Sequence, residues 1–98
     1  MNVILKNYPD VTIIAGVAAV QLVREDKARK RLEVYALDTN IDAIHIGYDA
    51  NVDTDSYDYV NPGEHRVFDS TTNLIVSREL WVIATNATQS IIVREFVE

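Results

Sequence analysis

Apolar and polar residues alternate with a period of two along most of the chain, which is the pattern of β-strands that bury one face. In the segment RLEVYA, the alternation places Leu32, Val34 and Ala36 on one face. The segment IHIG repeats the alternation around His45, and its glycine is expected to end or bulge the strand. Further strands are predicted at residues 18–23, 66–68, 80–85 and 91–97, with 11–15 as another candidate.

Short polar turns separate the predicted strands. Asn61-Pro62-Gly63-Glu64 predicts a β-turn, because proline presets φ at the second position and glycine accepts a positive φ at the third. The segment 23–31 contains good helix formers but no apolar stripe, so we expect a loop with at most one turn of helix. Six to eight short strands joined by such turns predict an all-β fold. The expected architecture is an antiparallel β-sandwich of the jelly-roll or immunoglobulin-like type.

The chain of 98 residues is long enough for one domain. We expect residues 17–98 to form the sandwich and residues 1–16 to form an N-terminal arm or an edge strand. Val3, Ile4 and Leu5 are apolar and are expected to be buried, either on another subunit or in the sheet of their own domain.

Composition and charge argue against several classes of function. The chain has no cysteine, which excludes a disulfide framework and a zinc–thiolate site. Its longest apolar stretch, residues 11–20, is shorter than the about 20 residues needed to span a bilayer. A net charge of −6 argues against binding to a nucleic-acid backbone. We therefore expect a soluble protein made in a cytoplasm, with neither nucleic acid nor membrane as a partner.

The charges are unevenly distributed along the chain. Five of the nine basic residues fall between positions 24 and 31, whereas residues 32–65 contain eight acidic residues and no Lys or Arg. A solvated basic loop beside acidic loops explains this pattern. The alternative is that Arg29, Lys30 and Arg31 contact an acidic surface on a neighbouring subunit and orient it.

The stretch YDANVDTDSYDYV, residues 48–60, contains four aspartates. It is not an EF-hand loop, because Thr54 and Val60 stand where that loop needs glycine and glutamate. A looser calcium site remains an alternative, but we favour a solvated loop and predict no cofactor or resident metal. Loops at the end of a sandwich often carry recognition residues, and tyrosines beside aspartates can bind a sugar or a protein. The candidate recognition residues are Tyr48, Asp49, Asp53, Asp55, Tyr57, Asp58 and Tyr59.

The sequence contains no recognisable catalytic motif. The serines lack a nucleophile elbow, and His45 and His65 lack the spacing of a two-histidine metal site. Paired carboxylates could serve a glycosidase, but they would need a deep cleft for which a 98-residue sandwich has little room. Trp81 lies in a strong strand pattern and is expected in the core. We therefore expect no enzymatic activity.

The strands also follow an order that is recognisable as a set. VQLV, ARKRLEVYALDT, AIHIGYDANV, VNPGEHRVFDS, LWVIAT and IIVREF occur in this sequence one after another. This series, covering residues 17–98, resembles a group of small bacteriophage virion proteins. Those proteins look like β-sandwich modules of head decoration (cement) proteins and of head or tail fibres.

The resemblance implies a capsid decoration protein without catalytic residues. Such a protein binds the major capsid protein or another virion protein and stabilises the assembled capsid by mass action. It would be made in the host cytoplasm and then lie on the capsid surface of the virion, and a homo-oligomer is expected, with a trimer favoured. The alternative is a receptor- or glycan-binding module of a phage fibre, which would use the Tyr/Asp loop.

Overall fold

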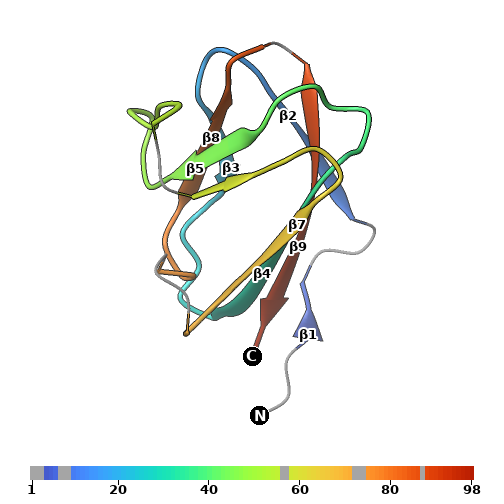
Figure 1. Ribbon diagram of the computed structural model, residues 1–98. Helices are drawn as coiled ribbons and strands as arrows, with labels where there is room; N and C mark the ends of the chain where they lie inside the picture. Colours follow the sequence, from blue (N-terminus) through green and yellow to red (C-terminus); the bar gives the residue numbers. More distant parts are fainter. Residues whose placement is uncertain (1–3, 7–9, 56–57, 72–74, 87) are drawn as a thin grey trace.

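The computed structural model describes residues 4–6, 10–55, 58–71, 75–86 and 88–98. These residues form nine strands and no helix, which confirms the all-β prediction and exceeds the predicted strand number by one (Figure 1). The strands are β1 (Ile4–Leu5), β2 (Val11–Ala15), β3 (Val20–Val23), β4 (Arg29–Ala36), β5 (Ile44–Gly47), β6 (Asp58–Val60), β7 (His65–Asp69), β8 (Leu80–Ala84) and β9 (Gln89–Val97).

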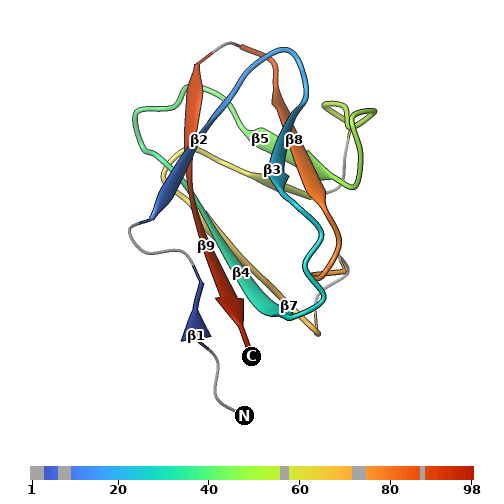
Figure 2. The same cartoon turned by 180° about the vertical axis from the view of Figure 1, so that it is seen from behind.

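The strands form two antiparallel sheets that pack on each other as a β-sandwich. Sheet A has the order β9-β4-β7, with β1 and β2 both paired to the other side of β9. Sheet B has the order β3-β8-β5-β6. Figures 1 and 2 show the two layers from opposite sides, with β2 at the margin of sheet A beside β9.

The strand pairs are nested in the sequence. Strand β2 pairs with β9, β3 with β8, β4 with β7, and β5 with β6, each time antiparallel. Successive pairs alternate between the two sheets. The chain therefore behaves as one long hairpin that is folded over to give two layers.

The hydrophobic core lies between the inner faces of the two sheets. The predicted face of β4 is confirmed, because Leu32, Val34 and Ala36 are all buried. Ile44 and Ile46 of β5 are also buried, as their alternation around His45 predicts. The other buried apolar side chains are Ala15, Leu22, Val23, Val60, Phe68, Leu80, Val82, Ala84, Ile91 and Val93.

Trp81 does not lie in this core, and its predicted placement is wrong. Leu80 and Val82 on β8 point inward, so the period of two places Trp81 on the outer face of sheet B. There the indole nitrogen Nε1 donates a hydrogen bond to Glu79 at 3.0 Å. A strong strand pattern identified the element but not which of its alternating positions faces inward.

The predicted turn at residues 61–64 is confirmed. The amide of Glu64 donates to the carbonyl of Asn61 at 3.0 Å, and Gly63 has a φ of 80°. A side chain at this φ would strain the backbone, which explains the glycine. The Gly63 amide also donates to the Ala36 carbonyl at 3.0 Å, so the turn is tied to the end of β4.

The segment 23–31 differs from its predicted form, because β4 already begins at Arg29. The loop before it is a tight turn built on Asp26. Its carbonyl accepts the Arg29 amide at 3.0 Å, and its carboxylate accepts the Ala28 amide at 2.9 Å. The helix-forming residues of this segment therefore form a hydrogen-bonded turn and no helical turn.

Candidate functional site

The acidic stretch forms a series of turns between β5 and β6. The Asp49 carboxylate accepts the Asn51 amide at 2.8 Å, and the Asp53 carboxylate accepts the Asp55 amide at 2.9 Å. Asp49, Asp53 and Asp55 are all exposed. The segment is therefore not the extended strand along which the alternate carboxylates would all point the same way.

Gly47 allows the acidic loop to fold back on the end of β5. A Cβ atom at this position would lie 2.8 Å from Cγ2 of Val52, which is closer than side-chain atoms can approach. The half-buried Val52 thus anchors the loop, and its amide also donates to the Asp49 carbonyl at 3.1 Å. The base of the loop is held in place while its carboxylates face solvent.

Among the tyrosines predicted for recognition, Tyr48 contacts other parts of its own chain. Its hydroxyl oxygen accepts the amide of Ile75 at 2.9 Å, and Cζ of Arg78 lies 4.1 Å from its ring centroid. Tyr59 on β6 is 44% exposed, and its ring centroid lies 5.9 Å from that of His45. Tyr57 lies outside the described residues. The predicted recognition set therefore keeps Tyr59 and the exposed aspartates, whereas Tyr48 is largely committed to its own chain.

Asp58 helps to close the sandwich on the side of β6 and β7. Its carboxylate pairs with Nη2 of Arg66 at 3.0 Å, and Nη1 of Arg66 donates to the Tyr59 carbonyl at 3.2 Å. These contacts join the edge of sheet B to the edge of sheet A. Asp58 is therefore removed from the predicted acidic recognition loop.

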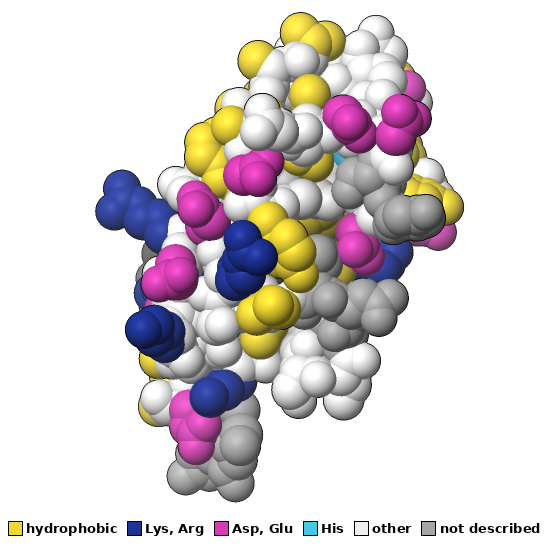
Figure 3. All heavy atoms as spheres, turned by 90° about the vertical axis from the view of Figure 1, so that its left-hand side faces the viewer, with side chains coloured by type: hydrophobic (Ala, Val, Ile, Leu, Met, Phe, Trp, Pro, Cys, Tyr) yellow, Lys and Arg dark blue, Asp and Glu magenta, His cyan; other side chains and the backbone are white. Residues whose placement is uncertain are grey.

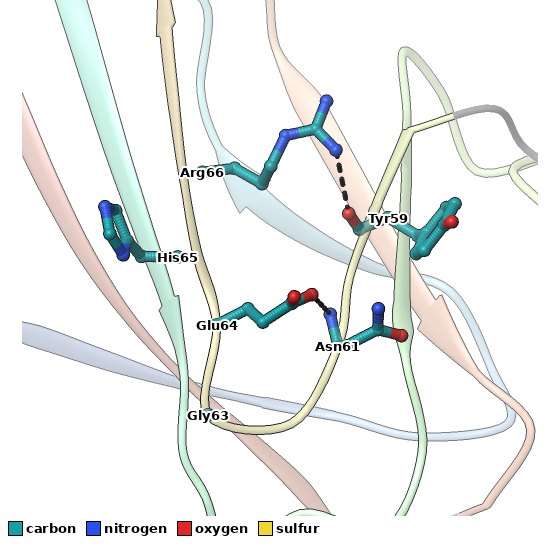
Figure 4. A pocket seen from close by; sticks show the side chains of 6 residues that line it. All are labelled: Tyr59, Asn61, Gly63, Glu64, His65 and Arg66. Atoms are coloured by element: carbon teal, nitrogen blue, oxygen red, sulfur yellow. Dashed lines mark hydrogen bonds between the residues drawn. The ribbon is translucent and has the colours of Figure 1, made fainter.

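The connection from β6 to β7, which crosses from sheet B to sheet A, borders an open hollow of about 730 Å³ (Figure 4). Arg66 reaches across it to the Tyr59 carbonyl, and Glu64 accepts the Asn61 amide at 3.3 Å. The rings of Tyr59 and His65 point to opposite sides of this connection. Glu64 and Arg66 are thus used to hold the β6–β7 connection together, and the two rings do not converge on one ligand position.

The predicted basic contact has to be corrected at Arg29. This residue is only 1% exposed, and its guanidinium pairs with Glu95 at 2.7 Å. It is therefore used inside its own chain and cannot contact a partner surface. Lys30 and Arg31 remain exposed, with Lys30 3.9 Å from Glu98 and Arg31 2.7 Å from Glu33.

The N-terminal segment pairs with its own domain. Ile4 of β1 is opposite Val97 and Leu5 is opposite Phe96. Leu5 is half-buried, but Ile4 is 63% exposed and so buries little apolar surface in the single chain. Val3 lies outside the described residues.

Sequence reasoning missed a network of side chains on the outer face of sheet A. Glu33 of β4 accepts hydrogen bonds from the Tyr35 hydroxyl at 2.8 Å and from Nε of Arg31 at 2.9 Å. Arg94 of β9 lies opposite Glu33, with its Cζ 5.2 Å from the Tyr35 ring centroid, and pairs with Asp10 through two hydrogen bonds. Although it is on an outer face, Glu33 is only 8% exposed.

Aromatic rings next to this network extend it into a surface of the kind found in protein interfaces. The His65 ring stacks on the Tyr35 ring with 5.4 Å between centroids, and His65 is exposed. Phe96 lies under the Arg31 guanidinium, with 5.8 Å from Cζ to the ring centroid. Ordered cations and aromatic rings of this kind are enriched in protein interfaces. Arg31, Glu33 and Tyr35 alternate along β4 and therefore lie on the same face. Their neighbours on β7 and β9 follow only from the register of the three strands.

Several groups set the ionisation of Glu33. Burial opposes its negative charge, but the hydrogen bonds from Tyr35 and Arg31 and the charges of Arg31 and Arg94 outweigh that effect, so its pKa is lowered from 4.5. The pKa of the Tyr35 hydroxyl is raised from 10.0, chiefly by its hydrogen bond to Glu33. The pKa of Asp10 is lowered by its hydrogen bonds with Arg94.

Replacing Glu33 by glutamine should flatten the pH dependence of stability on the acid side. A carboxyl whose pKa is lower in the folded chain stabilises the fold above its unfolded value near 4.5, and this contribution is lost as the pH falls through the folded value. We expect the free energy of unfolding to fall less steeply below that pH in Glu33→Gln than in the wild type. Urea titrations at a series of pH values measure this slope. Profiles that run parallel in Glu33→Gln and the wild type would contradict this role of Glu33.

Two further properties concern the described residues alone. They contain no group of three His, Asp or Glu side chains placed to hold a metal ion. They also form no helix that is long and apolar enough to cross a membrane.

Comparisons with known proteins give no relative: no protein-family profile, no curated protein and no solved structure matches this chain. The resemblance to phage virion proteins therefore stays a prediction.

Proposed function

We propose that this chain is a non-enzymatic bacteriophage structural protein that binds the assembled capsid and stabilises it. In this proposal the sandwich is of the jelly-roll type, and the protein lies on the capsid surface of the virion. Its partner is the major capsid protein or another exposed virion protein.

The observation that supports this proposal best is the nested strand pairing. Four antiparallel pairs, β2 with β9 through β5 with β6, alternate between two sheets. A double-sheet jelly roll built from two Greek keys occurs in viral capsid and lectin domains. Topology alone does not fix a function, so the resemblance of residues 17–98 to virion modules is what favours the capsid over other roles.

The distribution of charge is compatible with binding in one orientation. On the face in Figure 3, Lys and Arg side chains occupy the middle and lower parts, and the upper part carries Asp and Glu side chains without them. An acidic end directed away from the capsid would keep neighbouring copies soluble, and exposed cations such as Lys30 could meet an acidic capsid surface.

Co-sedimentation with capsids tests the proposal. The purified chain should sediment with empty, expanded capsids of the phage that encodes it and should saturate a fixed number of sites. An Asp49→Asn/Asp53→Asn/Asp55→Asn variant serves as a control, because it alters only exposed loop carboxylates and should bind as well as the wild type. Chain that stays in the supernatant at every concentration would overturn the proposal.

A fibre module that binds a receptor or glycan is the second candidate. The specific observation in its favour is the exposed Tyr59, which lies beside His45 at the foot of the acidic loop. Exposed aromatic rings stack well on sugars. This candidate predicts saturable adherence to host cells or their polysaccharide, with loss of adherence in Tyr59→Ala or in the triple asparagine variant.

A further inference from the structure

The single tryptophan of the chain, Trp81, lies on the outer face of sheet B and is not part of the hydrophobic core. Two hydrogen bonds fix polar groups beside it. The Glu79 carboxylate accepts the Trp81 indole N–H at 3.0 Å and the amide N–H of Gln21 at 2.9 Å. Gln21 is exposed and is opposite Trp81 in the β3–β8 pair. The indole ring is therefore held next to an amide and a carboxylate on the outside of the sandwich.

The register of sheet B places a second aromatic ring on the same face. His45 of β5 is opposite Tyr59 on one side and Ile83 on the other, and Gly47, two positions further along, is opposite Trp81. Neighbouring strands lie about 4.8 Å apart and successive residues about 3.4 Å apart, so the Cα atoms of Trp81 and Tyr59 are roughly 12 Å apart. Tyr59 is 44% exposed. The face thus carries two rings, with His45 on the strand between them.

The charge around this face is negative. None of the four strands of sheet B contains Lys or Arg, and neither does the acidic loop at residues 48–57. Strand alternation places Gly47 on the outer face, where Val52 of the loop packs against it beside Trp81. The loop therefore borders the face with its exposed carboxylates. An anionic ligand would meet carboxylates here without a cation to pair with, so a ligand without negative charge is favoured.

We propose that the outer face of sheet B binds a neutral oligosaccharide. Sugar rings have apolar C–H faces and hydroxyl edges, so a site for them combines aromatic rings with hydrogen-bonding side chains. Trp81 and Tyr59 supply the rings, and Gln21 and Glu79 supply acceptors and donors for hydroxyl groups. The distance between the rings fits a ligand of more than one sugar unit.

This site is independent of the proposed binding to capsids. It develops the second candidate function, but it places the ligand on the strands of sheet B and not on the acidic loop alone. A chain that binds capsids but no polysaccharide would contradict only this inference. A chain that binds polysaccharide but no capsids would contradict only the proposed function.

Trp81 itself can report the binding, because its fluorescence is the only tryptophan signal of the chain. A neutral glucan, mannan and galactan and the anionic polysaccharide alginate would each be titrated into the purified chain. We expect at least one neutral polymer to change the emission saturably and alginate to leave it unchanged. The proposal would be overturned if none of the three neutral polymers changed the emission, or if alginate bound as tightly as the neutral polymers.

Two exposed positions test the assignment without a change in the core. Tyr59→Ala removes one ring and Gln21→Ala removes the amide beside the other, and each should raise the Kd by roughly tenfold. Ile14→Ala is the control, because it removes an exposed apolar side chain from the other sheet and should leave the Kd unchanged. Circular dichroism verifies the fold of each variant. Binding that both site variants keep, and that only the triple asparagine variant loses, would place the ligand on the loop and overturn the proposal.

Discussion

Replacing Arg29 by alanine should lower the free energy of unfolding by about 3–5 kcal/mol, the cost of breaking a buried ion pair by removing one partner. Nε of Arg29 donates to the Val76 carbonyl at 2.7 Å, and Nη2 donates to the Arg78 carbonyl at 2.6 Å. Nη1 donates to the Arg24 carbonyl at 2.9 Å and to the Glu95 carboxylate at 2.7 Å. One side chain therefore joins the β3–β4 loop, the β7–β8 loop and the end of β9.

The loss should be large relative to the whole stability, because small domains are stable by only about 5–15 kcal/mol. Urea denaturation followed by circular dichroism measures it. Lys30→Ala is the matched control, since Lys30 is exposed and lies 3.9 Å from Glu98, and it should change stability by less than about 1 kcal/mol. If Arg29→Ala were as mild as this control, Arg29 would not be the anchor of these loops.

Replacing Phe68 by alanine should cost a similar amount, about 3–5 kcal/mol, because it removes a large side chain from a packed core. Phe68 lies on the inner face of β7, pairs with Leu32 of β4 and is 1% exposed. The cavity left by this substitution would face sheet B, and filling it with water would cost free energy.

Phe96→Ala makes the same chemical change on the opposite face of sheet A. The Phe96 ring is half-buried on the outer face, with Cζ of Arg31 5.8 Å from its centroid, so we expect a loss of about 1 kcal/mol. Urea midpoints of the two variants at one temperature give the comparison. Equal losses would mean that the inner and outer faces of sheet A are assigned wrongly.

The alternation of apolar and polar residues predicted the strands well, because the alternation within a strand involves only residues that are close in sequence. The alternation in RLEVYA identified the inner face of β4, and the Pro-Gly sequence identified the turn before β7. The same pattern could not give the inward face of β8, since Trp81 and Val82 are both apolar and either could face the core. Sheet order also lies beyond a local pattern, because β9 pairs with strands more than fifty positions away.

Charge was harder to interpret than hydrophobicity. Arg29, Lys30 and Arg31 are alike in sequence, but the register of β4 on β9 shifts between Arg29 and Arg31, so that Arg29 is buried and the other two are exposed. The network around Glu33 depends on the register of three strands, so no spacing within one strand could predict it. The acidic stretch was interpreted correctly as solvated at Asp49, Asp53 and Asp55, whereas Tyr48 and Asp58 are used within the fold.

The thermal stability of capsids tests the central claim of capsid stabilisation most directly. Empty expanded capsids would be heated with and without saturating chain, and their dissociation followed by light scattering. A ligand that binds only the assembled state must raise its dissociation temperature. The dissociation temperature should rise, level off as the chain saturates its sites, and rise by the same amount with the triple asparagine variant. A dissociation temperature that does not change at saturating chain would contradict it.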